Sequence, residues 1–115
     1  KEYMIHQEEG GAIQISEDVV ASIASSTAAE VDGVSALMSA NVSDFMGGKK
    51  MTAKGIRVEM DGDAIMVYVF ITVRYGCTIG EVAKKAQNAV YQALESTTGY
   101  PVSAVNVHVG GISFN

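Results

Sequence analysis

One cysteine and one histidine have the clearest potential for nucleophilic chemistry. Cys77 precedes a predicted helix, and a thiol at a helix N-terminus is favoured as the reactive thiolate. His108 lies in a predicted strand and could act as a general base if the two side chains were close. Their separation matches no recognisable motif, and no Asp or Asn is placed to orient the histidine. We therefore interpret Cys77 as a small loop residue and His108 as a strand-surface residue, and we expect the protein not to be an enzyme.

The residues that could bind a metal are scattered along the chain. His6, Cys77 and His108 lack the closely spaced ligand pairs that a zinc site normally shows. Asp61 and Asp63 flank a glycine, but the calcium-binding loop that ends in a glutamate is absent. We interpret the two aspartates as turn residues, and we expect no metal and no cofactor.

A basic cluster is the one electrostatic patch that the sequence offers. It lies in the acid-free window 47–58 and consists of Lys49, Lys50, Lys54 and Arg57. Such a cluster speeds encounter with phospholipid headgroups, an acidic partner or an anionic ligand, and it is equally typical of a solvated loop. Phe45 and Met46 stand beside it, and an aromatic ring with a flexible thioether suits a shape-tolerant protein contact. The glycines in this window lack the spacing of a phosphate-binding loop, so nucleotide binding is not predicted.

The composition fits one domain in a reducing compartment. Of 115 residues, 48% are hydrophobic, which is enough for a single core. The net charge of −5 argues against binding nucleic acid through its phosphates. One cysteine cannot form an internal disulfide, which favours the cytoplasm, and no apolar run approaches the roughly 18 to 20 residues of a membrane span. Aromatic residues make up 7% of the chain and there is no Trp, so the core is thin and we expect a homo-oligomer.

Two segments have the caps and the periodicity of helices. Ser16 can cap the first, in which apolar residues recur at helical spacing over 19–31. Residues 78–81 read Thr-Ile-Gly-Glu, a capping box, and the apolar stripe of the second helix begins with its isoleucine. Gly99 and then Pro101 follow in the order that is typical of a helix end.

Strands are predicted where apolar residues alternate or run continuously. The predicted strands are a short one around residues 13–15 and the segments 34–38, 56–60, 64–75 and 102–109. The dipeptide Asp61-Gly62 signals a hairpin between two of them. The strand over 64–75 is apolar on both faces, as a central strand would be. Residues 1–11 are predicted to be a flexible arm before a single domain over 12–115.

This order of elements predicts an α+β fold, a two-layer domain with two long helices packed on one face of a mixed β-sheet. The opposite sheet face would then carry Met66, Tyr68, Phe70, Asn106 and His108. If nothing within the chain covers that face, it is an apolar patch that requires a partner. We expect the partner to be a second copy of the chain.

Four sequence pieces together resemble the alkaline-shock-protein family of bacterial cell-envelope stress proteins. The pieces are Ser16-Glu17-Asp18-Val19-Val20, Glu30-Val31-Asp32-Gly33-Val34, Val73-Arg74-Tyr75-Gly76 and Val105-Asn106-Val107-His108-Val109. The resemblance singles out Arg74, Tyr75, Gly76, Asn106 and His108 as family motif residues. It implies a cytoplasmic protein of Gram-positive bacteria or their relatives, without enzymatic activity. Some members of the family gather at the membrane through a small transmembrane anchor protein, and others are linked genetically to fatty-acid metabolism.

The sequence and the resemblance lead to one functional hypothesis and two alternatives. The hypothesis is a non-enzymatic interaction protein in cell-envelope stress or homeostasis, which self-associates and binds a partner such as a membrane-anchor protein. Such a protein would be cytoplasmic or peripheral to the inner face of the membrane. The first alternative is a regulatory ligand-binding domain linked to fatty-acid metabolism, which a deep apolar pocket would favour. The second is an enzyme, which requires a hydrogen-bonded pair of Cys77 and His108.

Overall fold

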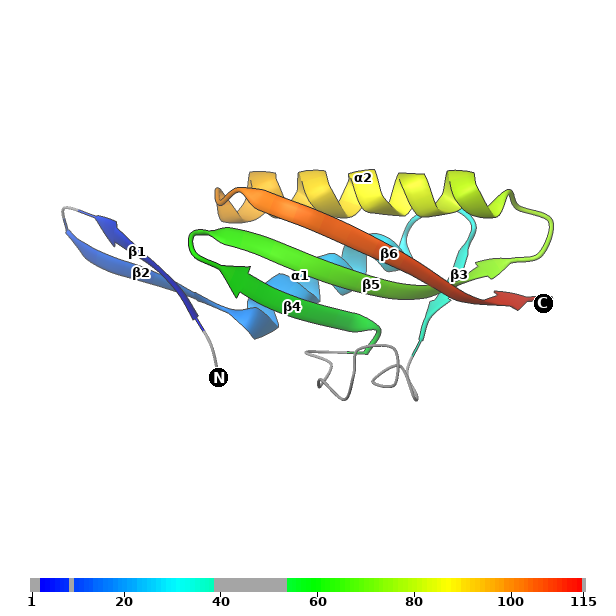
Figure 1. The fold of residues 1–115 in the computed structure, drawn as a ribbon, viewed down its shortest axis with the longest axis horizontal. Coiled ribbons are helices and arrows are strands. Elements are labelled where there is room, and N and C mark those ends of the chain that lie inside the picture. The colour runs from blue at the N-terminus through cyan, green and yellow to red at the C-terminus, as the bar shows by residue number, and fades with distance from the viewer. Residues whose placement is uncertain (1–2, 9, 39–53, 115) are drawn as a thin grey trace.

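The computed structural model describes residues 3–8, 10–38 and 54–114. The elements in these ranges are β1 (Tyr3–Glu8), β2 (Gly11–Ser16), α1 (Glu17–Ala29), β3 (Val34–Leu37), β4 (Ile56–Asp61), β5 (Ala64–Arg74), α2 (Ile79–Thr98) and β6 (Val102–Ser113). The two helices and strands β3 to β6 form one body. Strands β1 and β2 form a separate hairpin that projects beyond the end of the main sheet (Figure 1).

Strand β5 is the centre of the sheet. One of its edges pairs in parallel with β6, and the other pairs antiparallel with β4 and then with β3. Val67 therefore has Val58 as its partner on one side and Val105 on the other. The turn between Asp61 and Ala64 joins β4 to β5, as the Asp-Gly dipeptide predicts. The sheet is mixed and β5 is central, as the sequence predicts.

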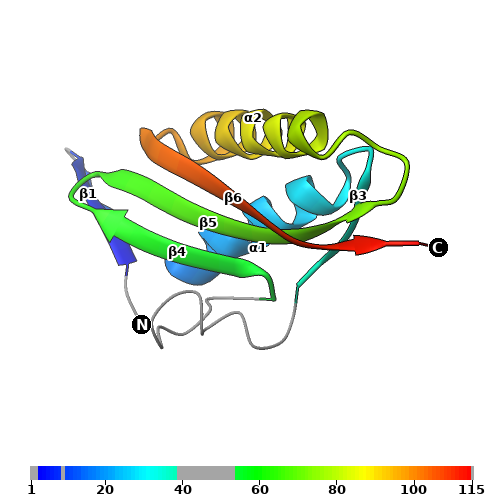
Figure 2. The same ribbon diagram turned by 45° about the vertical axis from the view of Figure 1, so that its right-hand side comes forward.

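Both helices cover the same face of this sheet. Helix α1 packs mainly against β3 and β4, and α2 packs against β6 and alongside α1. The two views show the helices together on one side, with the other side of the sheet facing away from them (Figures 1 and 2). The predicted α+β architecture with two helices on one face is confirmed.

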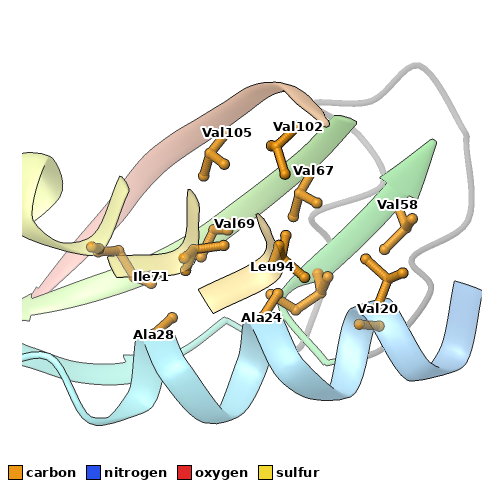
Figure 3. Close-up of a cluster of buried hydrophobic side chains, with 14 of the residues drawn as sticks. Val20, Ala24, Ala28, Val58, Val67, Val69, Ile71, Leu94, Val102 and Val105 are labelled. Carbon is orange, nitrogen blue, oxygen red and sulfur yellow. The ribbon is translucent and has the colours of Figure 1, made fainter. Parts of the chain in front are cut away.

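The core lies between the helix layer and the sheet (Figure 3). The inward residues of β5 are fully buried, and they are Ile65, Val67, Val69, Ile71 and Val73. Helix α1 contributes small residues such as Ala24 and Ala28, so its backbone approaches the sheet closely, whereas α2 contributes larger residues such as Leu94. Each buried Val, Ile or Leu stabilises the fold by about 1.5 to 3 kcal/mol. The body is therefore held mainly by aliphatic packing.

The helix ends follow the sequence signals at Ser16 and Gly99, but α1 ends at Ala29, before the end of the predicted helical spacing at residue 31. Ser16 caps α1, because its Oγ accepts a hydrogen bond from the N–H of Val19 at 3.3 Å. Thr78 occupies the N-cap of α2, but its side chain makes no capping hydrogen bond, so the predicted capping box is wrong on that point. The carbonyl of Thr78 instead accepts the N–H of Glu81 at 3.1 Å. Gly99 ends α2 in the left-handed region with φ of 77°, as expected for a glycine at a helix end.

The predicted apolar stripes are too wide at the start of each helix. Val19 is 49% exposed and Ile79 is 41% exposed. Helix α1 buries Val20 and Ala21 in the same turn instead. Neighbouring residues on a helix point about 100° apart, so Val19 cannot face the core when the next two residues do.

The amino-terminal region also differs from the prediction. Residues Tyr3–Glu8, predicted to belong to a flexible arm, form β1. This strand pairs with β2 from Tyr3 opposite Ser16 to Glu8 opposite Gly11. The segment reads Tyr-Met-Ile-His-Gln-Glu and lacks the apolar alternation that identifies a half-buried strand. Only the strand around residues 13–15 was visible in the sequence pattern.

Candidate interaction surface

The sheet face away from the helices is the surface that the sequence predicts for partner binding. Side chains alternate along a strand, so the burial of Ile65, Val67 and Val69 against the helices turns the intervening residues to the other face. The register arranges that face in rows of neighbours: Glu59, Met66 and Ala104; then Arg57, Tyr68 and Asn106; then Phe70 and His108. The predicted facing of these residues is therefore correct. We call them the open sheet face.

Phe70 lies beneath this surface rather than on it. Its side chain is 2% exposed, although it points away from the helices. The ring of His108 packs against it, with ring centroids 5.3 Å apart and planes inclined by 49°. Met66 and Tyr68 are only partly buried and remain at the surface. An approaching partner would therefore contact Met66 and Tyr68, with Phe70 as the support below.

Charge on the open sheet face is balanced locally. Arg57 and Glu59 point to the same side of β4, and an Arg57 nitrogen lies 3.7 Å from a Glu59 carboxylate oxygen. Their side chains are 22% and 27% exposed, so the pair is largely shielded from solvent by its neighbours. The face therefore presents an apolar strip beside a neutralised ion pair.

The basic cluster is described only in part. Lys54 is exposed in the turn before β4, and Arg57 belongs to the open sheet face. Lys49 and Lys50 lie outside the described residues, as do Phe45 and Met46. Arg57 and Lys54 therefore do not act as one basic patch, because the charge of Arg57 is paired with Glu59 on the sheet surface.

Cys77 and His108 lie on opposite sides of the sheet. Cys77 packs against the edge of the core beside Gly33, on the helix side. His108 belongs to the open sheet face and packs on Phe70. The sheet therefore separates the two side chains, and the structure does not bring this pair together for nucleophilic chemistry.

Two of the family motif pieces meet in space at the far end of β5. The N–H of Arg74 donates to the carbonyl of Gly33 at 2.9 Å, and Val34 pairs with Val73. The guanidinium of Arg74 also reaches the carboxylate of Asp32 at 3.2 Å. Both side chains of this ion pair are well exposed, which limits its contribution to stability. These motif residues therefore join β3 to the end of β5.

An exposed aromatic pair lies next to this junction. Tyr75 is 68% exposed and Phe114 is 75% exposed, and their ring centroids lie 4.9 Å apart. The N–H of Tyr75 donates to the carbonyl of Ser113 at 2.7 Å, which fixes the two segments side by side. Sequence reasoning missed Phe114, because its proximity to Tyr75 depends on the parallel pairing of β5 with β6. Gly76 follows in a turn with φ of 97°.

Two surface hollows border α2. The first, of about 560 Å³, is lined by Gln92, Glu95, Ser96, Gly99, Tyr100 and Pro101. The second, of about 370 Å³, lies between α2 and β6 and is lined by Gly80, Ala83, Lys84, Gln87 and Val107. Both hollows are open to solvent, and each has polar side chains in its lining, among them Glu95 in the first and Lys84 in the second. Neither is the deep apolar pocket that the ligand-binding alternative requires.

Tyr91 is the residue of α2 with a perturbed acidity. A hydrogen bond to Glu95, one helical turn further on, raises the pKa of Tyr91, and the negative charge of Glu95 raises it further. The phenol therefore remains protonated at neutral pH.

In the described part of the chain, no three His, Cys, Asp or Glu side chains are placed to hold a metal ion. Neither described helix combines the length and the apolar character needed to cross a lipid bilayer.

Comparison with known proteins agrees with the motif pieces and the fold. The profile of the ASP23 (alkaline shock protein) family, described as having a cell envelope-related function, matches residues 5–114. The chain is 31% identical over 107 residues to YqhY of Bacillus subtilis (strain 168), covering 91% of this chain and 79% of that protein. It is 32% identical over 106 residues to YloU of the same organism, covering 89% of this chain and 88% of that protein.

A streptococcal relative and solved structures extend the comparison. Spy1614 of Streptococcus pyogenes serotype M6 is 35% identical over 106 residues, covering 89% of this chain and 88% of that protein. Among solved structures, the copper form of the MamM CTD superposes with a TM-score of 0.57 at 16% identity, covering 85% of this chain and 97% of that domain. The low identity makes this a likeness of fold alone. The family profile covers the whole α+β body, including the motif residues that join β3 to the end of β5. The chain therefore belongs to the ASP23 family, which has a cell envelope-related function.

Proposed function

We propose that the protein is a non-enzymatic interaction protein of the bacterial cell envelope, which acts by self-association and by binding a partner. The observation that carries the proposal is the open sheet face. Two helices cover one side of the sheet, while Met66 and Tyr68 remain partly exposed on the other. Such a surface is typical of a contact with another protein. Membership of a cell envelope-related family supports the cellular setting.

The arrangement of residues on this face suits a protein contact. Tyr68 lies in the middle row, between Arg57 on β4 and Asn106 on β6. Tyrosine provides a large apolar surface with a polar tip, which favours interfaces where one end is buried and the other is wet. The neutralised pair of Arg57 and Glu59 removes a charge barrier to close approach. A second copy presents the same set of residues, because a two-fold contact brings the same surface patch of both copies face to face.

The same proposal includes a location and a further partner. The single cysteine fits a reducing cytoplasm. A cytoplasmic protein with a cell envelope-related role would reach the inner face of the membrane through a partner, such as a small membrane-anchor protein. Lys49, Lys50 and Lys54 are the residues that we propose for contact with an acidic surface there.

Replacing Tyr68 by Glu tests the open sheet face. A carboxylate placed in such a contact must lose its hydration without gaining a partner, so Tyr68→Glu should lower the mass of the assembled protein. The mass is measured by light scattering at tens of micromolar, and circular dichroism checks that the helices are retained. Val19→Glu is the matched control, because Val19 is an exposed apolar residue on α1.

The proposal predicts a reduced mass for Tyr68→Glu and an unchanged mass for Val19→Glu. A wild-type protein that is monomeric at this concentration contradicts it. An equal mass for wild type and Tyr68→Glu also contradicts it, because the face would then play no part in assembly.

A further inference from the structure

The outer edge of β6 is an open strand edge in the described part of the chain. Its inner edge pairs with β5, and no other described strand borders it. The strand is 12 residues long and contains no Lys, Arg, Asp, Glu or Pro. Charged residues and prolines are the usual protection of an edge strand against pairing with another chain. Strand β6 therefore offers a long edge without that protection.

The bonding of β5 identifies which backbone groups of β6 point outward. The N–H of Ile65 donates to the carbonyl of Pro101 at 2.9 Å, so alternate residues of β5, starting with Ile65, bond toward β6. Val69 is one of these, and Val107 lies opposite it. In a parallel pair of strands, a residue whose N–H and C=O bond to the neighbouring strand lies opposite a residue whose N–H and C=O point away from the pair. Val107, and likewise Val109, thus direct backbone donors and acceptors to the outer edge.

The side chain of Gln87 marks the beginning of this open edge. Its Nε2 donates to the carbonyl of Val105 at 2.9 Å. This hydrogen bond confirms that the carbonyl of Val105 points to the outer edge, and it provides that carbonyl with a partner. Beyond Val105 the hollow of about 370 Å³ separates α2 from β6. Gly80 lines it and has no heavy atom within 4 Å of the place where a Cβ would stand. The hollow therefore leaves room for side chains of a strand added at Val107 and Val109.

The β1–β2 hairpin is a two-stranded sheet that is not joined to the main sheet in the described part of the chain. It projects from the body, and in the described part of the chain β1 pairs only with β2 (Figure 1). An isolated two-stranded hairpin is marginally stable in water, and a third strand or a packing surface is needed to stabilise it. The outer edge of β1 is thus a donor that requires a receiving strand.

The hairpin cannot reach the edge of β6 in its own chain. Ser16 is both the last residue of β2 and the N-cap of α1, so no linker separates the hairpin from the helix. Helix α1 lies over β3 and β4, whereas β6 lies on the far side of β5 beneath α2. The receiving edge must therefore belong to another molecule.

We propose that β1 of one copy adds to the outer edge of β6 of a second copy, in the hollow beside α2. This contact rests on the proposed self-association and gives it a second surface, distinct from the open sheet face. Charge favours the pairing, because β1 carries Glu8 and no Lys or Arg, whereas Lys84 lines the hollow. Each copy offers one donor strand and one receiving edge.

Mixing two proline variants tests whether β1 of one copy pairs with β6 of another. Residue pairs of an antiparallel hairpin alternate between bonded and non-bonded, and counting from Glu8 opposite Gly11 places the N–H of Ile5 on the outer edge. Ile5→Pro therefore removes a donor from β1, and Val107→Pro removes a donor from the receiving edge, where an edge strand tolerates proline. All proteins carry Tyr68→Glu, so that contacts through the open sheet face do not contribute.

The expected masses distinguish this contact from the open sheet face. The Tyr68→Glu parent should still self-associate, and each proline variant alone should be monomeric. A mixture of the two should form a 1:1 heterodimer, because one supplies the intact edge and the other the intact strand. A monomeric Tyr68→Glu parent, or a proline variant with the mass of the parent, overturns the strand contact and leaves the open sheet face to be judged by its own experiment.

Amide hydrogen exchange gives a second readout that does not depend on Val107→Pro folding. In assembled wild-type protein the N–H groups of Val107 and Val109 should be protected, and Ile5→Pro should speed their exchange at least about tenfold. The N–H of His108 points toward β5 and should stay protected in both proteins, which controls for unfolding. Equal exchange of Val107 in wild type and Ile5→Pro overturns the proposal.

Discussion

Gly33 is the residue at which backbone conformation and packing constrain the chain together. Its φ is 98°, a region that side chains with a Cβ rarely adopt. A Cβ there would also lie 2.5 Å from a methyl carbon of Val82 on α2. Gly99 has a similar φ of 77°, but a Cβ at that position would meet no heavy atom within 4 Å. A side chain would therefore cause backbone strain alone at Gly99, and both backbone strain and crowding at Gly33.

Gly33→Ala should destabilise the protein more than Gly99→Ala. The strain of a left-handed residue predicts a loss of about 1 to 2 kcal/mol for Gly99→Ala. Gly33→Ala adds the displacement of Val82, which brings the expected loss to roughly 2 to 5 kcal/mol. Denaturant unfolding of both variants measures the free energies. Equal losses would show that α2 shifts freely to accommodate the methyl group.

The sequence predicts part of this picture. The order of Gly99 and Pro101 is a local signal, and it correctly gives the end of α2. Gly33 follows the helical spacing over 19–31 in the sequence, but α1 ends earlier, at Ala29. The contact of Gly33 with Val82 is not visible, because it depends on how α2 packs across the start of β3.

At the scale of elements, the two helices begin in different ways. The Oγ of Ser16 accepts a backbone N–H of α1, whereas the side chain of Thr78 bonds to no N–H of α2. A capping side chain satisfies one of the N–H groups that have no partner within the helix. The sequence motif identifies both N-cap positions, but it does not determine the side-chain rotamer of Thr78.

Ser16→Ala should therefore cost more than Thr78→Ala. Loss of a capping hydrogen bond is expected to lower the free energy of unfolding by about 1 kcal/mol. Thr78→Ala removes no such bond, so a change within about 0.5 kcal/mol is expected. Thermal and denaturant unfolding of the two variants provide the comparison. A larger loss for Thr78→Ala would mean that the threonine caps α2 in solution after all.

At the scale of the whole molecule, the hairpin and the body are two parts of unequal stability. Strand β1 pairs with β2 alone among the described strands, whereas β3 to β6 share one sheet beneath the two helices. The sequence predicts the body well, because aliphatic periodicity identifies the strands and helices that bury surface. It predicts β1 poorly, because the segment Tyr-Met-Ile-His-Gln-Glu has no alternation of apolar and polar residues to detect.

Ile5→Pro should leave the stability of the body unchanged in dilute solution. The expected change in the free energy of unfolding is within about 0.5 kcal/mol, since β1 pairs with β2 and with no strand of the main sheet among the described strands. Ile71→Ala is the contrast, because it empties a fully buried site on β5 and should cost about 2 to 5 kcal/mol. Both are measured by denaturant unfolding of monomeric protein. A loss for Ile5→Pro close to that for Ile71→Ala would show that the hairpin belongs to the same cooperative unit.

The parallel pairing of β5 with β6 also sets an order of events during synthesis. Strand β4 meets β5 through a tight turn, a local contact of the kind that forms within microseconds. Strand β6 reaches β5 only after α2 has been made, and such a pairing across a long stretch of chain is slow. A nascent chain that ends within α2 therefore exposes the unpaired N–H and C=O groups along the edge of β5 that β6 later covers. The interval before β6 is complete is when this protein depends most on protection from aggregation.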